Sequence, residues 1–124
     1  MMFKENSKAI YLQIVDRICD EILSGSLCAG QRLPSVREYA ATVQVNPNTM
    51  MRAYDHLSSQ NIIYNKRGIG YFLSDDARDI VLRTRRDEFL GNEINEFFRQ
   101  LELLGVSPDV LKSQYESYLS QNPN

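Results

Sequence analysis

Apolar residues recur at helical spacing in three stretches of the first half of the chain. Between residues 9 and 23 they fall in two adjacent rows, which is typical of a helix that packs one broad face on a core. These rows contain Ile10, Tyr11, Ile14, Val15, Ile18, Cys19, Ile22 and Leu23. Shorter repeats predict a helix over residues 36–42 and another over residues 47–59. We expect the three helices to share one core.

The two shorter helices begin with recognisable capping signals. Ser35 is followed three residues later by Glu38, which is a capping box. Asn46 is a favourable N-cap, and Pro47 suits the first helical position because its missing N–H would be unpaired there. The few residues between these helices leave room only for a turn, so a helix-turn-helix is predicted.

The pattern then changes from helical spacing to strand-like residues. Residues 61–65 and 71–73 are predicted to form two strands, and residues 66–70, with two cations and two glycines, their tip. A helix-turn-helix with such a hairpin is a winged helix-turn-helix, which places one helix in the DNA major groove and the hairpin beside it.

The remaining residues predict two helices. Ser74-Asp75-Asp76 is a helix-start signal, and one long helix is expected to run to about residue 104. Ser107-Pro108 then begins a last helix. The apolar positions of the long helix step by 4, 3, 4 and 3 residues: Leu90, Ile94, Phe97, Leu101 and Leu104.

The sequence therefore predicts a mainly α protein with a small β-hairpin. We expect an N-terminal winged helix-turn-helix domain over residues 1–73 and a short C-terminal helical hairpin over residues 74–124. Two helices cannot cover so wide an apolar stripe, so we expect two chains to pair their hairpins into a four-helix bundle. The alternative is that the hairpin folds back on the winged helix of its own chain.

The net charge of −2 does not by itself indicate that the protein binds nucleic acid, but the distribution of charge along the chain does. Residues 30–73 carry five cations against two carboxylates, whereas residues 74–124 carry six cations against ten carboxylates. A basic middle beside an acidic tail favours DNA binding by the first part and a different role for the second.

Motifs for catalysis and metal binding are missing from the sequence. It has no nucleophile elbow, phosphate loop or paired-carboxylate pocket, so we expect no catalytic residues and no cofactor. One histidine and two cysteines complete no common metal site, and we expect Cys19 and Cys28 to be free thiols. No apolar run is long enough to cross a membrane and no signal peptide is evident, so a cytoplasmic location is expected.

Three ordered motifs carry a resemblance to a known family. The stretch 33–40, LPSVREYA, resembles the Leu-Pro-Ser-x-Arg-Glu-Leu-Ala signature of the GntR family of bacterial transcription regulators. The stretch 45–54 resembles the YtrA-like subfamily more narrowly, and residues 67–73 resemble the family's wing. Tyr39 replaces the usual Leu, a change expected in the core, and Tyr71 replaces the usual Thr near the wing tip.

The resemblance implies which side chains meet DNA. The expected contacts are Arg37, Asn48, Thr49, Arg52, Lys66, Arg67 and Gly68, with Asn46 as the cap of the helix start that faces the duplex. The cations suit phosphates, and the short polar side chains suit base edges or phosphates. Arg52 could instead pair with Asp55.

These features together predict a DNA-binding transcription regulator, in our interpretation a dimeric bacterial repressor of a pseudo-palindromic operator. Its partners would be double-stranded DNA and a second copy bound through the C-terminal helices. We expect no larger effector-binding domain, so a small-molecule effector would bind between the tail helices or at their junction with the winged helix. The alternative function is a winged-helix adaptor that binds proteins without specific DNA binding.

Overall fold

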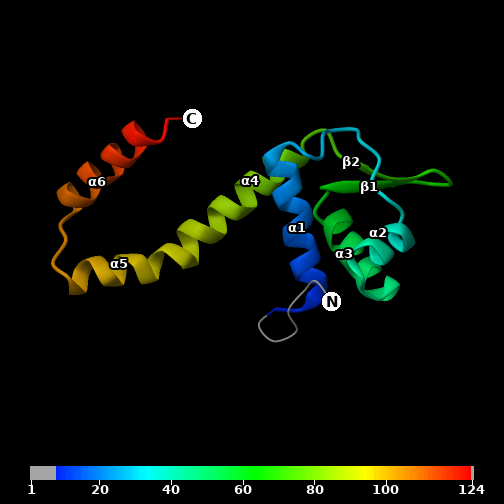
Figure 1. Ribbon diagram of the computed structural model, residues 1–124, viewed down its shortest axis with the longest axis horizontal. Helices are drawn as coiled ribbons and strands as arrows, with labels where there is room; N and C mark the ends of the chain where they lie inside the picture. Colours follow the sequence, from blue (N-terminus) through cyan, green and yellow to red (C-terminus); the bar gives the residue numbers. More distant parts are fainter. Residues whose placement is uncertain (1–7, 124) are drawn as a thin grey trace. The chain divides into compact units, whose positions relative to one another are not determined.

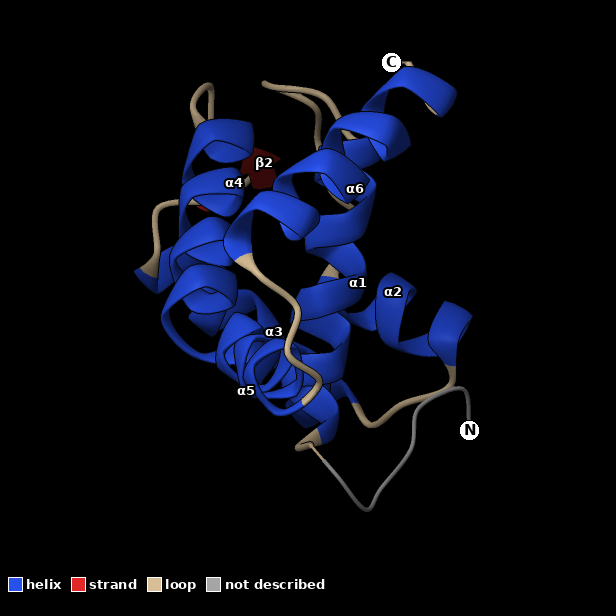
Figure 2. Ribbon diagram, turned by 90° about the vertical axis from the view of Figure 1, so that its left-hand side faces the viewer, coloured by secondary structure: helices blue, strands red, loops and turns tan. Residues whose placement is uncertain are grey.

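The computed structural model describes residues 8–123. The chain forms two compact units, which divide between Thr84 and Arg85 (Figure 1). Helices make up nearly all of the regular structure (Figure 2). The two strands form one antiparallel hairpin. The predicted fold class, mainly α with a small β-hairpin, is confirmed.

Helix α1, Ile10–Ser24, is the first of the three predicted helices. Its buried face is the one that the apolar rows predict, with Ile14 and Ile18 fully buried. Gly25 ends the helix in a left-handed conformation, with φ of 87°, and its N–H donates to the carbonyl of Ile22. Glycine adopts this backbone region without steric cost, which explains the sharp end.

Helices α2, Val36–Val43, and α3, Pro47–Ser59, form the helix-turn-helix. The capping box of Ser35 and Glu38 is present in both directions, and the Asn46 side chain accepts a hydrogen bond from the Asn48 N–H at 2.7 Å. Gln44 ends α2 in the left-handed region. Helix α3 packs against both α1 and α2, so it is the central element of the first unit.

The hairpin joins β1, Ile63–Lys66, to β2, Gly70–Leu73. Ile63 lies opposite Leu73, and Lys66 lies opposite Gly70. The strands therefore extend further toward the tip than the sequence predicts, and the turn comprises only residues 67–69. The reason is that the N–H of Ile69 donates to the carbonyl of Lys66 at 2.9 Å, which closes a tight turn.

Residues 30–33 run along the other edge of β2, a pairing that the sequence does not predict. The N–H of Leu33 donates to the Tyr71 carbonyl at 2.8 Å, and the N–H of Leu73 donates to the Gln31 carbonyl at 2.9 Å. Arg32 forms an antiparallel bridge with Phe72. This pairing ties the segment before α2 to the hairpin.

Three tyrosines extend the core from the helices to the hairpin. The Tyr54 ring meets Tyr39 and Tyr71 edge-on, at centroid distances of 6.5 and 5.0 Å. The Tyr54 hydroxyl donates to the Pro34 carbonyl at 2.6 Å. Burial raises the pKa of Tyr54, so this hydroxyl stays protonated and the hydrogen bond persists at physiological pH.

The C-terminal helices differ from the single long helix expected over residues 75–104. Helix α4, Ala77–Glu88, continues into a π-helical turn, η1, over Phe89–Glu93, and then into α5, Ile94–Leu103. Ala77 and Val81 of α4 belong to the core of the first unit. Helix α6, Pro108–Gln121, begins as predicted, with the Ser107 hydroxyl accepting from the Val110 N–H.

Candidate DNA-binding surface

The N-terminus of α3 is the centre of the candidate surface. Asn46, Pro47 and Asn48 are exposed, and Thr49 is half-buried. The positive end of the helix dipole therefore faces solvent beside short polar side chains. Figure 1 shows α2, α3 and the hairpin on the same side of α1, with the hairpin tip reaching furthest from it.

Arg37 lies exposed at the second position of α2. Its neighbour Glu38 is held by the cap: the Ser35 N–H donates to the carboxylate at 3.1 Å, and the Ser35 hydroxyl accepts from the Glu38 N–H at 3.1 Å. These hydrogen bonds with Ser35 lower the pKa of Glu38. The Glu38 carboxylate thus completes the cap of α2, and Arg37 is the residue before it in the first turn of the helix.

Arg52 lies one turn beyond Asn48 on the same row of α3. Its guanidinium carbon is 4.1 Å from the centroid of the Tyr11 ring of α1. His56, one turn further along α3, also contacts Tyr11, with the two rings edge-on and their centroids 6.2 Å apart. Among the described residues Arg52 forms no ion pair with Asp55, so the alternative that the sequence left open is not the one adopted.

The wing holds the remaining predicted residues. Lys66 ends β1, and its Nζ lies 5.2 Å from the centroid of the Phe72 ring. Arg67 and Gly68 are exposed in the turn, and Gly68 has φ of 79°, where a side chain would be strained. The structure thus places the predicted residues in three groups: Arg37 on α2, four residues at the start of α3, and three at the hairpin tip.

Arg32 is a cation that sequence reasoning missed. It precedes the family-like motif, in a segment with no periodicity, and only the pairing of residues 30–33 with β2 brings it to the wing. A Cβ added to Gly70 would lie 3.0 Å from the Arg32 Nε, so the guanidinium lies over this glycine. No signal in the sequence identifies this neighbour.

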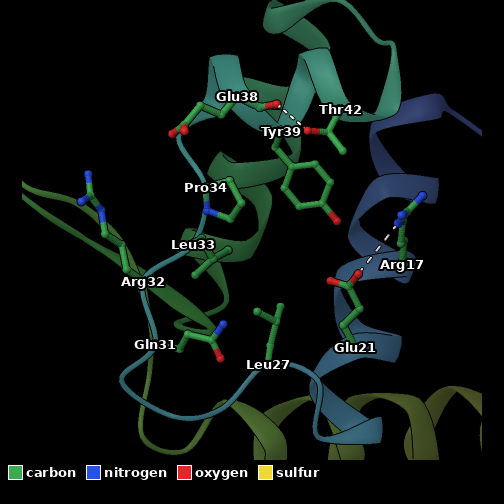
Figure 3. A pocket seen from close by; sticks show the side chains of 10 residues that line it. All are labelled: Arg17, Glu21, Leu27, Gln31, Arg32, Leu33, Pro34, Glu38, Tyr39 and Thr42. Carbon is green, nitrogen blue, oxygen red and sulfur yellow. Dashed lines mark hydrogen bonds and ion pairs between the residues drawn. The ribbon is translucent and has the colours of Figure 1, made fainter.

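A hollow of about 530 Å³ lies between α1, the 27–34 segment and α2 (Figure 3). Tyr39 points its hydroxyl toward Arg17 and Glu21 of α1, which pair at 3.9 Å. Burial raises the pKa of Tyr39, which keeps the hydroxyl neutral. Its ring occupies the core, as expected for the residue that replaces the family's leucine, while its hydroxyl reaches a polar rim.

The predicted dimerisation residues lie in the second unit. Leu90 and Leu104 are 57% and 74% exposed, Phe97 is also exposed, and Ile94 and Leu101 are half-buried. Leu90, Ile94 and Phe97 help to line an apolar groove of about 810 Å³ between α5 and α6. Within residues 85–123 no residue is buried, so this unit has no core of its own.

Residues 8–123 contain neither a metal-binding cluster nor a membrane-spanning helix. No group of three or more histidine, cysteine or acidic side chains there is arranged to hold a metal ion. None of the helices in that part of the chain is long and apolar enough to span a membrane.

Comparison with known proteins matches the part of the chain that carries this surface. The model of the family "Bacterial regulatory proteins, gntR family" matches residues 10–73. An uncharacterised HTH-type transcriptional regulator of Bacillus subtilis, YhcF, is 34% identical over 86% of this chain and 87% of its own length. The HTH-type transcriptional repressor YtrA of the same organism is 40% identical over 59% of this chain and 56% of its own.

Comparison with solved structures extends the similarity to most of the chain. A putative GntR-family transcriptional regulator from Bacteroides thetaiotaomicron has 48% sequence identity to this chain and a TM-score of 0.79. The match covers 91% of this chain and 98% of the Bacteroides protein. The similarity therefore includes the C-terminal helices as well as the winged helix.

Proposed function

The chain belongs to the GntR family of bacterial regulatory proteins and is a transcription regulator rather than an enzyme; we propose that it is a dimeric repressor that binds a pseudo-palindromic DNA operator. The observation that carries the proposal is the exposed, capped start of α3 beside a cationic wing. A helix N-terminus with short polar residues suits the major groove, and a cationic hairpin suits the neighbouring backbone or minor groove.

Each predicted contact has a role that its position supports. Asn48 and Thr49, on the first turn of α3, would read base edges or position the helix, with Asn46 holding its start. The cations Arg37, Arg52, Lys66 and Arg67 would contact phosphates. Gly68 would let the wing tip approach the duplex closely, because it has no side chain and holds a left-handed backbone.

We propose that residues 1–73 form the DNA-binding domain and residues 74–124 the dimerisation segment, whose first helix, α4, also contributes Ala77 and Val81 to the core of the first unit. Support for a partner comes from the second unit, whose large apolar side chains on α5 and α6 are exposed and whose groove is open. Exposed apolar patches of this size on a stable protein mark an interface. A second copy offers the same stripe, so the two would form a four-helix bundle.

A two-fold dimer matches an operator with two-fold symmetry. Its recognition helices would enter major grooves about one DNA turn, roughly 34–36 Å, apart. We favour repression because the similar protein YtrA is named a repressor. Because its proposed target is DNA, we propose that the protein is located in the cytoplasm. A small-molecule effector would have the α5–α6 groove as its binding site.

The test is DNA binding by the purified protein. Labelled random-sequence duplex is titrated at low salt, and bound sites are then selected from random DNA. We expect binding that weakens as salt rises, and selected sites with two inverted half-sites. Arg67→Ala should weaken binding to all sequences and flatten the dependence of log K on log salt by about one unit. No binding at low salt would reject the proposal and favour a protein-binding adaptor.

A further inference from the structure

We propose that Arg32 is a further DNA-contacting residue, which binds a backbone phosphate from the outer wing face. This face comprises Arg32, Tyr64, Lys66, Gly70 and Phe72. The proposal rests on the proposed DNA-binding function and adds to it a residue, and a face of the hairpin, that the family-like motifs do not include.

Strand pairing places these residues on one face. Arg32 bridges Phe72, and Phe72 lies opposite Tyr64. Lys66 and Gly70 also lie opposite each other, two positions further toward the tip. Residues directly opposite, and every second residue of a strand, share a face of the sheet. The opposite face is the inner one, since Leu33, Ile63 and Leu73 are buried.

Gly70 makes room for the guanidinium. With no Cβ at this position, the Arg32 Nε lies 3.0 Å from the point that a Cβ would occupy. The backbone of Gly70, with φ of 142°, is also in a region that other residues rarely adopt. Because Gly70 lies opposite Lys66, the guanidinium lies at the last strand pair before the tip. Figure 3 shows the Arg32 side chain beside the hairpin.

Aromatic rings support the cations on this face. Tyr64 and Phe72 stack at 5.8 Å with an angle of 22° between their planes, and the Lys66 Nζ lies over Phe72. The rings hold Lys66 beside the position of Arg32, and the tip adds Arg67. Three cations therefore gather at the end of the hairpin, carried by three different strand or turn segments.

Charge identifies the partner as a polyanion. No aspartate or glutamate occurs between Asp55 and Asp75 in the sequence. Glu38 is close enough for its carboxylate to interact electrostatically with Arg32, but that carboxylate accepts the Ser35 N–H and the residue is exposed to solvent. DNA presents closely spaced phosphates, and a guanidinium binds one of them with two parallel hydrogen bonds.

The proposal is tested by the salt dependence of binding to labelled random-sequence duplex, followed by fluorescence anisotropy. Arg32→Ala should weaken binding at low salt and flatten the slope of log K against log salt by about one unit, because one phosphate contact is lost. Arg32→Lys should keep most of the slope. Arg83→Ala, an equal charge change on α4, should leave the slope unchanged. Thermal melts establish that each variant is folded.

The outcomes separate this proposal from the function on which it rests. If Arg67→Ala flattens the slope and Arg32→Ala does not, the contact by Arg32 is rejected and the DNA-binding function stands. If Arg32→Ala and Arg83→Ala flatten the slope of log K against log salt equally, the contact is also rejected, because equal changes indicate a long-range charge effect. If the unmodified protein binds no DNA at low salt, the function itself fails.

Discussion

The guanidinium carbon of Arg52 lies 4.1 Å from the centroid of the Tyr11 ring. A residue of α1 thus orients a cation of the proposed recognition helix. An arginine that is held in place before binding loses less side-chain freedom when it meets a phosphate. The contact therefore links the packing of α1 on α3 to the proposed DNA-binding surface.

Tyr11→Leu should weaken DNA binding by about 2- to 5-fold, since an exposed cation–π contact contributes about 0.5–1 kcal/mol. Tyr11→Phe keeps the ring and should bind like the wild type. The readout is anisotropy with labelled duplex. In an Arg52→Ala background the Tyr11→Leu change should have no further effect. Additive losses in the double variant would show that Tyr11 does not act through Arg52.

Asn48→Ala should relax sequence selectivity more than it weakens nonspecific binding. Asn48 lies exposed on the first turn of α3, where its side chain would reach base edges in the proposed complex. Competition between a selected site and random duplex measures the ratio of the two affinities. Equal losses on both duplexes would assign Asn48 to the phosphates instead.

Glu38→Gln should reduce the fall in stability that occurs as the pH drops below about 4.3, the pKa of an unfolded glutamate. The folded-state pKa of Glu38 is lowered by its hydrogen bonds with Ser35. The ionised Glu38 carboxylate therefore stabilises the folded state fully at pH values above its unfolded pKa of about 4.3. This stabilisation is lost as the pH falls through the lower pKa of the folded state. Glutamine can still complete the capping box, so the variant removes mainly the pH-dependent part of this residue's contribution to stability.

Urea unfolding at a series of pH values measures this effect. Ser35→Ala is the matched variant, because it removes the cap itself and should cost about 0.5–2 kcal/mol at neutral pH. If Glu38→Gln shows the same acid dependence as the wild type, Glu38 makes no pH-linked contribution.

Ile18→Ala should destabilise the protein by about 2–5 kcal/mol, because Ile18 is fully buried in the core. Urea unfolding gives the free energy. Ile69→Ala, at an exposed position of the wing turn, should change stability by less than about 0.5 kcal/mol. The folded fraction of Ile18→Ala should keep its DNA affinity, and a loss of affinity without a loss of stability would be inconsistent with a purely structural role.

Phe97→Glu should convert the proposed dimer to a monomer, because a carboxylate would be buried in the bundle without a partner. Sedimentation equilibrium at micromolar concentration measures the mass. Glu102→Gln, a change on an exposed position of α5, serves as the control and should remain dimeric. A wild-type protein that sediments as a monomer would rule out the bundle and leave folding back on the winged helix as the alternative.

Local chemistry allowed much of the fold to be predicted from the sequence. The starts of α2 and α3 follow from Ser35, Glu38, Asn46 and Pro47, since a helix start is decided by hydrogen bonds between residues two or three apart. The buried face of α1 follows from the period of its apolar residues. The assignment of individual DNA contacts stays a prediction, because it depends on a partner molecule.

Other features were decided only by segments that lie far apart in the sequence. Residues 30–33 join β2 across some forty positions, and this pairing alone carries Arg32 to the wing. Tyr11 reaches Arg52 because α1 packs on α3. The sequence by itself determined the starts of α2, α3 and α6, the core face of α1 and the presence of the hairpin, since these depend on neighbouring residues. Only the tertiary structure decided which side chains meet, because packing and strand register have no signature within a short window of sequence.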